Sequence, residues 1–317
     1  MVVLIAVVLV CFVFDDVKND TRVKIEKGLS TYQIADVLKE NDVISNKTLF
    51  LLFVNFSEYR GKLQYGTFDF EKGDGYFEII RRLATSGAKK ETVTVAIPEG
   101  FSVEKIIKKL VDSGLGTKKE YEKALNESYD YEFIKHIKAS PECNYKLQGF
   151  LFPATYEFYT DDMPHKIIDT MLKEFEKQYN SLGVSYDGLY EIITKASLIE
   201  REAKIDSERS KIAGVIENRL DGNMRLQIDA TVVYTISDGL YDVERVLYSD
   251  LETNSPYNTY KITGLPIGPI SNPGIKSIKA AISPDKHNYL YYRTDNNKND
   301  GSHIFTENFE AHTNANN

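Results

Sequence analysis

The segment LYEIITKASLIEREAK, residues 189–204, combines a helical repeat of apolar residues with one acidic residue on the same stripe. Leu189, Ile193 and Ala196 are spaced as neighbours on one face of a helix, and Glu200 is the next position along that face. A carboxylate on a buried stripe is costly unless it is paired, protonated or lines a cleft. The pattern therefore predicts a buried helix on which Glu200 is either a catalytic group or the partner of a nearby arginine.

A second helix is expected directly after this segment, over residues 207–220. Ser207 is its predicted N-cap, and Gly222 follows its end. This helix brings Asn218 to a turn that leads into the run MRLQIDATVVY, residues 224–234. The two helices and the run after them are therefore expected to lie close together.

Gln227 and Asp229 are polar positions between apolar residues of that run. In one interpretation Asp229 caps a helix that begins at Ala230. In the other, Gln227 and Asp229 line a cleft that faces Glu200. The residues alone favour neither interpretation.

A strand, a glycine turn and a short amphipathic helix recur in the N-terminal third of the chain. The two clear copies are VKIEKGLSTYQIADVLKENDVI, residues 23–44, and VAIPEGFSVEKIIKKLVDSGLG, residues 95–116. Each has a serine after the glycine, as a helix N-cap, and apolar residues on one helical face. A fainter copy contains Gly73. The unit resembles LysM-type glycan-binding modules, although a strand, a glycine turn and a capped helix in this order are also common in other αβ proteins.

From residue 187 onward the pattern is mostly helical, with a helix expected over residues 275–282 and a strand over residues 289–294. We therefore expect an α+β fold. A small LysM-like αβ subdomain is predicted over residues 17–90, and a mixed α/β catalytic domain over residues 91–317.

The first fourteen residues, MVVLIAVVLVCFVF, carry no charge and are followed at once by two aspartates. A helix that spans a bilayer needs roughly 17 to 25 apolar residues. We interpret residues 1–16 as the outer part of a single-pass membrane anchor, with a cleaved signal peptide or a buried strand as alternatives. An anchor would place the rest of the chain outside the cytoplasm.

Composition argues against two classes of partner. The formal net charge of −8 and the pI near 5.3 provide no basic field for a phosphate backbone, so nucleic acid is not expected. Two cysteines and five histidines show no metal-ligand spacing. We expect neither a metal nor a cofactor.

Four motifs occur in a fixed order: LQGFLFPATY at 147–156, ASLIEREA at 196–203, NRL with MRLQIDATVVY at 218–234, and SPYNTYKITGLPIGPISNPG at 255–274. Together they resemble the endolytic murein transglycosylase, or YceG-like, family over most of residues 23–312. Four ordered motifs are far more specific than any one of them.

The resemblance implies a set of site residues. Glu200 matches the family's catalytic glutamate, the first Glu of its ASxIExE motif, and Glu202 is expected to point elsewhere. The predicted substrate-binding residues are Gln148, Asn218, Gln227, Asp229, Tyr234, Asn258 and Tyr260. Two positions depart from the family pattern, because Gln148 stands where a Glu is usual and Ala154 where an Asp is usual.

The resemblance also implies the reaction, cleavage of the bond between N-acetylmuramic acid and N-acetylglucosamine in peptidoglycan strands. The 6-hydroxyl of the sugar closes a 1,6-anhydro ring, and Glu200 would first donate and then accept a proton. Such an enzyme would terminate growing strands beside membrane-bound glycan polymerases. The alternatives are a lysozyme-like hydrolase that uses Glu200 with Asp229, and a non-catalytic glycan-binding or scaffold protein.

Overall fold

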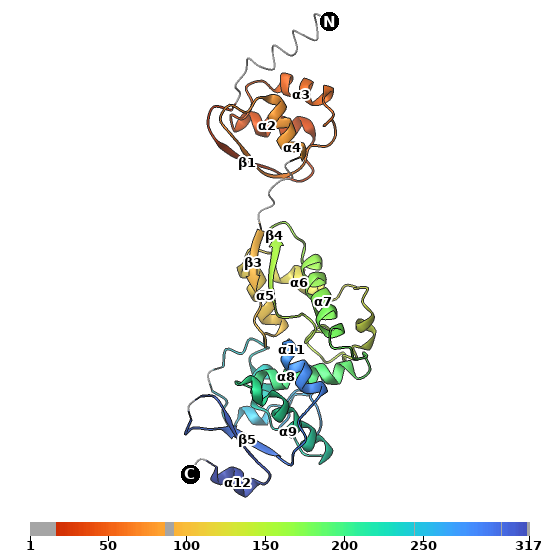
Figure 1. The fold of residues 1–317 in the computed structure, drawn as a ribbon, viewed down its shortest axis with the longest axis vertical. Coiled ribbons are helices and arrows are strands. Elements are labelled where there is room, and N and C mark those ends of the chain that lie inside the picture. The colour runs from red at the N-terminus through yellow and green to blue at the C-terminus, as the bar shows by residue number, and fades with distance from the viewer. Residues whose placement is uncertain (1–16, 86–91, 244, 299, 316–317) are drawn as a thin grey trace, which may run out of the picture. The chain divides into compact units, whose positions relative to one another are not determined.

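The computed structural model describes residues 17–85, 92–243, 245–298 and 300–315 (Figure 1). The chain divides into two compact units, Met1–Val93 and Thr94–Asn317. The predicted anchor, residues 1–16, lies outside the described residues. Within the described ranges, no helix is long and apolar enough to cross a bilayer. The mixture of helices with small sheets makes this an α+β protein, as predicted.

The first unit builds its core between a two-stranded sheet and three helices. Its elements are β1 (Thr21–Ile25), α2 (Thr31–Glu40), α3 (Lys47–Phe56), β2 (Gly66–Phe70) and α4 (Tyr76–Thr85). The two strands are antiparallel, with Val23 opposite Phe68. Alternate residues of each strand are buried, so one face of the sheet packs on the apolar faces of the helices.

The predicted order of strand, glycine and helix N-cap is confirmed in both clear copies. Gly28 has a φ of 88° and precedes Ser30, which forms a capping box at the start of α2. Gly100 has a φ of 79°, and Ser102 accepts from the backbone N–H of Lys105. These local signals give the expected turns, while a glycan-binding role for the first unit stays a prediction.

The second unit is mainly helical, with two small sheets. Its elements are β3 (Thr92–Ala96, which begins in the first unit), α5 (Val103–Asp112), α6 (Lys118–Ala124), η1 (Glu132–His136), β4 (Thr155–Tyr159), α7 (Pro164–Asn180), α8 (Leu189–Glu202), η2 (Asp206–Glu208), α9 (Arg209–Asp221), α10 (Asp229–Ile236), η3 (Asp250–Glu252), α11 (Ile275–Ile282), β5 (Tyr291–Thr294), β6 (His303–Thr306) and α12 (Phe309–Asn314).

The central helix of the second unit is α8, the helix expected from the opening segment. It packs against α9, α10 and α11, and the stripe residues Leu189, Ile193 and Ala196 are buried. Strand β5 pairs with β6 in an antiparallel hairpin and also contacts α9. The C-terminal end of α8, the start of α10 and the β5–β6 hairpin thus come together (Figure 1).

One predicted helix start is wrong, and one predicted helix has its expected bounds. Ser207 lies in the 3-10 turn η2, and α9 begins at Arg209 with no side-chain cap. Helix α10 begins at Asp229 itself, whose side chain does not cap it, so the structure does not support the cap interpretation of Asp229. Helix α11 covers residues 275–282, as predicted.

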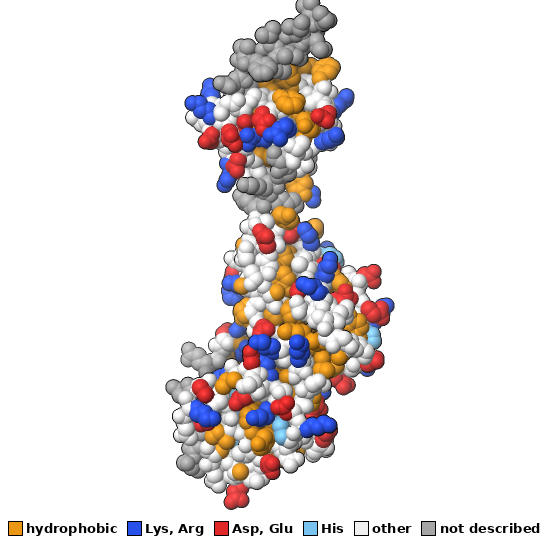
Figure 2. All heavy atoms as spheres, viewed as in Figure 1, with side chains coloured by type: hydrophobic (Ala, Val, Ile, Leu, Met, Phe, Trp, Pro, Cys, Tyr) orange, Lys and Arg blue, Asp and Glu red, His pale blue; other side chains and the backbone are white. Residues whose placement is uncertain are grey.

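Acidic and basic side chains are interspersed over the visible face of each unit (Figure 2). A pocket lined by more basic than acidic side chains would therefore differ from this mixed surface.

Candidate active site

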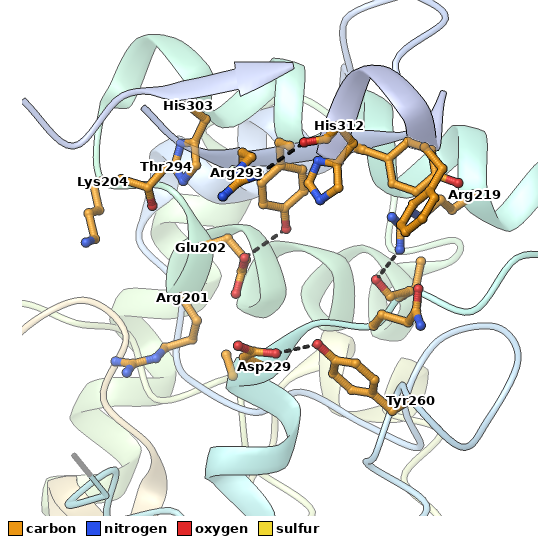
Figure 3. A pocket seen from close by; sticks show the side chains of 16 residues that line it. Arg201, Glu202, Lys204, Arg219, Asp229, Tyr260, Arg293, Thr294, His303 and His312 are labelled. Carbon is orange, nitrogen blue, oxygen red and sulfur yellow. Dashed lines mark hydrogen bonds between the residues drawn. The ribbon is translucent and has the colours of Figure 1, made fainter. Parts of the chain in front are cut away.

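A polar pocket of about 640 Å³ lies where α8, α10 and the β5–β6 hairpin meet (Figure 3). Its lining residues are Arg201, Glu202, Lys204, Arg219, Leu226, Gln227, Asp229, Ala230, Tyr260, Tyr291, Tyr292, Arg293, Thr294, His303, Phe309 and His312. Of the predicted site residues, the pocket brings together Gln227, Asp229 and Tyr260.

Glu202 is the last residue of α8 and forms part of the pocket wall. Its Oε2 accepts a hydrogen bond of 2.8 Å from the hydroxyl of Tyr292 on β5. Burial raises the pKa of Glu202, and the nearby charge of Asp229 also raises it; the Tyr292 hydrogen bond, His303 and Arg201 lower it, with a net shift upward. Glu202 is therefore a carboxyl group that holds its proton more firmly than usual at the edge of a pocket.

Asp229, at the start of α10, faces Glu202 across the pocket (Figure 3). Its Oδ1 accepts a hydrogen bond of 2.5 Å from the hydroxyl of Tyr260. Burial and the adjoining Asp229 raise the pKa of Tyr260, which keeps this phenol protonated as the donor. The cleft interpretation of Asp229 is thus the one that the geometry favours, although the carboxyl that it faces is Glu202.

Gln227 is held in a strained backbone conformation at the same pocket, with a φ of 51°. Its N–H donates to the carbonyl of Thr259 at 3.2 Å, and the next N–H, of Ile228, donates to Thr259 Oγ1 at 2.9 Å. Thr259 is fully buried. These bonds fix the run before α10 against the loop that carries Tyr260, so one threonine holds together the two segments that carry Gln227 and Tyr260.

Glu200 lies outside the set of residues that line this pocket, and its predicted catalytic role stays a prediction. Its Oε1 is 3.1 Å from Nη1 of Arg209, and its Oε2 accepts the N–H of Gly274 at 3.0 Å. Only 6% of the Glu200 side chain and 10% of the Arg209 side chain are exposed. Arg209 also donates to Ser277 at 2.6 Å. Glu200 is therefore a buried ion-pair partner that joins α8 to α9 and to the start of α11.

Two predicted binding residues, Asn218 and Asn258, do not line the pocket but hydrogen-bond to the segments that carry its lining residues. Asn218 Nδ2 donates to the carbonyls of residues 287 and 289, at 2.8 and 2.9 Å, and so fixes the chain before β5. Asn258 is fully buried, donates to two loop carbonyls and accepts the N–H of Tyr260 at 3.0 Å. Neither residue is among those that line the pocket.

The other two predicted binding residues, Tyr234 and Gln148, also lie away from the pocket lining. Tyr234 is fully buried and packs against the rings of Tyr241 and Tyr257. Gln148 is 1% exposed, and its Oε1 accepts the N–H of Val103 at the start of α5, at 2.9 Å. We therefore assign these two side chains to the core.

The residues that sequence reasoning missed are Glu202 as the pocket carboxyl, Tyr292 as its hydrogen-bond partner, and Arg219 and Arg293 as pocket cations. The segment ERE contained the signal, because its two glutamates lie about 200° apart on a helix and only one can continue the buried stripe. In the part of the chain that the structure describes, no group of three or more His, Cys, Asp or Glu residues could hold a metal ion.

The fold and the pocket define an α+β protein with a carboxyl-bearing cleft at the end of a buried helix. The chain belongs to the YceG-like family, whose model matches residues 23–317.

Relatives with known names and a solved structure agree with this assignment. The chain is 36% identical to the endolytic murein transglycosylase of Bacillus subtilis, over 95% of this chain and 85% of that protein. It is 27% identical to the endolytic murein transglycosylase of Streptococcus pneumoniae, over 93% of this chain and 57% of that protein. A crystal structure of a yceG-like protein from Listeria monocytogenes is similar with a TM-score of 0.59 and 31% identity, and the match covers 94% of this chain and 99% of that one.

Proposed function

We propose that this protein is a lytic transglycosylase that cleaves peptidoglycan glycan strands between N-acetylmuramic acid and N-acetylglucosamine, with Glu202 as its general acid and base. Membership of the YceG-like family and the names of its relatives support the reaction class. The observation that carries the assignment of Glu202 is its position: a partly buried carboxyl, with a raised pKa, at the wall of a sugar-sized polar pocket.

One carboxyl group suffices for this reaction. Glu202, whose pKa is raised by burial, donates a proton to the departing glycosidic oxygen. As a carboxylate it then takes the proton from the 6-hydroxyl of the muramic residue, which attacks C1 and closes the 1,6-anhydro ring. The nucleophile is part of the substrate and has a large effective molarity, so no carboxylate is needed to activate water.

Tyr292 and Asp229 adjust the proton affinity of Glu202 in opposite directions. The Tyr292 hydroxyl stabilises the carboxylate that forms after the first proton transfer. The charge of Asp229 favours the protonated form that the first step needs. Gln227 and Tyr260, on the opposite wall, are placed to position the sugar ring.

A hydrolase that uses Glu202 with Asp229 is the second candidate, because the two carboxyl groups face each other across the pocket (Figure 3). Hydrolases place such a pair roughly 5 to 9.5 Å apart, so that the second group can act as nucleophile or can activate water. The two reactions differ in their products: a transglycosylase leaves 1,6-anhydro ends, and a hydrolase leaves reducing ends.

Mass spectrometry of fragments released from purified glycan strands tests the reaction. The full chain is expected to release fragments with 1,6-anhydro ends, and Glu202→Gln is expected to release none while it still binds the strands. Reducing ends would show a hydrolase. Release of no fragment by the unaltered protein, combined with binding, would show a non-catalytic glycan-binding protein.

Residues 1–16 are proposed to anchor the enzyme in the cell membrane, with residues 17–317 outside the cytoplasm, where nascent strands are made. The first unit, with its strand-glycine-helix repeat, is proposed as a LysM-like glycan-binding module, and glycan polymerases as partners. Protease added to intact spheroplasts should digest residues 17–317. Full protection of these residues would contradict the proposed location.

A further inference from the structure

The pocket has an excess of positive charge in a chain of net charge −8. It is lined by four side chains that carry a fixed positive charge, Arg201, Lys204, Arg219 and Arg293, but by only two carboxyl groups. Among the described residues, none of the four lies within 4.0 Å of a carboxylate oxygen. Charged side chains elsewhere in the chain often pair with the opposite charge, as Arg209 does with Glu200 at 3.1 Å, so four cations without such a partner around one pocket form a local excess of positive charge.

Arg219 is the most constrained of these cations. It is 9% exposed, and its guanidinium lies over the ring of Tyr291 at 5.0 Å. Its Nε donates to the carbonyl of Leu290 at 2.6 Å, and its Nη1 donates to the carbonyls of Arg225 and Leu226. These neutral acceptors orient the guanidinium group of Arg219 but do not balance its positive charge. Buried arginines are rarely left without an anion.

The side chain of His312 lines the same pocket, beside the two arginines. Burial lowers the pKa of His312, and the charges of Arg293 and Arg219 lower it further. Its Nδ1 is buried and has no hydrogen-bond partner in the described part of the chain. Arg293 also donates to the carbonyl of His312, at 3.2 Å. An anion bound in this pocket would lie among the guanidinium groups of Arg219 and Arg293.

We propose that Arg219 and Arg293 form an anion site, which binds a carboxylate carried by the muramic residue next to the bond that Glu202 cleaves. This inference rests on the proposed function and specifies the substrate of the same pocket. Arg293 donates through Nη1 to the carbonyl of His312, and its planar guanidinium can bind a carboxylate through two parallel hydrogen bonds, which gives orientation as well as affinity. Arg219, whose Nε and Nη1 already donate to carbonyls, adds its charge and Nη2. The enzyme would therefore select muramic residues over uncharged sugars.

Peptidoglycan offers this carboxylate from two sources. A muramic residue with its peptide presents the carboxylates of the stem peptide, and a muramic residue without its peptide presents the free lactyl carboxylate. Both sources have the same chemistry, so the pocket charge alone does not separate them.

The test measures the binding of labelled glycan oligomers to the full chain carrying Glu202→Gln, which prevents cleavage. Three oligomers are compared: one with stem peptides, one stripped of peptides by an amidase, and one with all its carboxylates converted to methyl esters. We expect the ester to bind at least tenfold more weakly than one or both of the carboxylate forms. The stronger of the two carboxylate forms identifies the source.

Charge-removing variants then locate the site. Adding Arg293→Gln should weaken binding of the preferred carboxylate oligomer at least tenfold and leave binding of the ester unchanged. Arg219→Lys keeps the charge but loses the planar fork, and should show a smaller loss in the same direction if it folds. Lys279→Gln, at an exposed position on α11 outside the pocket, is the matched control and should bind all oligomers normally.

Equal binding of esters and free carboxylates, or an equal loss for both with Arg293→Gln, would overturn the anion site. Cleavage by the protein with Glu202 intact is measured separately on the same oligomers. Carboxylate-selective binding without any cleavage would leave the anion site standing and contradict the proposed function. Cleavage without carboxylate selectivity would support the proposed function and contradict the anion site.

Discussion

Glu200 and Glu202 are separated by a single residue on α8, yet they have opposite environments. Both oxygens of Glu200 are engaged, one by Arg209 and the other by the N–H of Gly274. Glu202 has one neutral hydrogen-bond donor, the hydroxyl of Tyr292, and it borders an open pocket. A carboxylate that is fully paired supports the fold, whereas one that is partly desolvated and unpaired can exchange a proton with a substrate. The partners, and not burial alone, decide which glutamate is suited to catalysis.

The largest effect on stability is expected for Glu200→Gln, which leaves the Arg209 guanidinium buried without its main counter-charge. Breaking a buried ion pair from one side costs about 3 kcal/mol at the low end of the usual range. We choose the low end because Asp206 still contacts Arg209 at 3.1 Å. Thermal unfolding followed by circular dichroism should show a melting temperature lower by roughly 6 to 12 °C.

Glu202→Gln is the matched control for that experiment, and its stability depends on pH in a defined direction. The folded-state pKa of Glu202 is raised from the ordinary 4.5, so the folded protein binds the proton more tightly than the unfolded chain. Ionisation therefore destabilises the fold as pH rises above about 4.5. Glu202→Gln should melt slightly higher than the unaltered protein at pH 8 and equally at pH 4. A loss of stability like that of Glu200→Gln would remove the contrast between the two glutamates.

Asp229→Asn is expected to have a moderate effect on activity. The amide still accepts the Tyr260 hydroxyl, but the negative charge that raises the pKa of Glu202 is gone. The alkaline limb of kcat/KM should therefore move to lower pH, with a loss of less than about tenfold at the optimum. A loss of 10²- to 10⁴-fold, typical of a missing general acid or base, would favour the hydrolase mechanism.

Tyr292→Phe should move the same limb in the opposite direction by a smaller amount. The variant removes the hydrogen bond that stabilises ionised Glu202, so the pKa of Glu202 rises and activity persists to higher pH. The pH profile of kcat/KM on glycan strands measures the shift. Equal or parallel shifts for Tyr292→Phe and Asp229→Asn would show that neither group acts through the proton affinity of Glu202.

The smallest effect is expected for Gln148→Glu, which restores the side chain that the family usually has at this position. Gln148 accepts the N–H of Val103 at the start of α5, and a carboxylate can accept the same bond at a favourable helix end. Because Gln148 does not line the pocket, the rate of fragment release should change less than about threefold, which is below 1 kcal/mol in barrier. A change of tenfold or more would connect this position to the chemistry.

Local sequence signals predicted the elements, and three of the predicted site residues, Gln227, Asp229 and Tyr260, line the pocket. The bounds of α11 and the caps of α2 and α5 followed from apolar spacing, glycine turns and serine N-caps, which act within a few residues. The burial of the α8 stripe was predicted correctly for the same reason. The start of α9 was missed because Asp206–Glu208 form the 3-10 turn η2 immediately before it.

The role of each glutamate depended on contacts that no local pattern contains. Glu200 is satisfied by the backbone of Gly274, 74 positions along the chain, and Glu202 by Tyr292, 90 positions along it. A helical stripe shows that a carboxylate is buried, but it does not show whether an arginine or a cavity lies opposite. Motif resemblance pointed to the segment ASLIEREA, which contains two glutamates whose environments differ only through tertiary contacts.

The most direct test of the account is fragment release by Glu200→Gln and Glu202→Gln in one assay on purified glycan strands, with each rate divided by the fraction of folded protein. We expect Glu202→Gln to lose about 10²- to 10⁴-fold, because the amide cannot give a proton to the leaving oxygen, and Glu200→Gln to keep most of its activity per folded molecule. Near-normal release by Glu202→Gln, together with loss of release by folded Glu200→Gln, would contradict the account and return the catalytic role to Glu200.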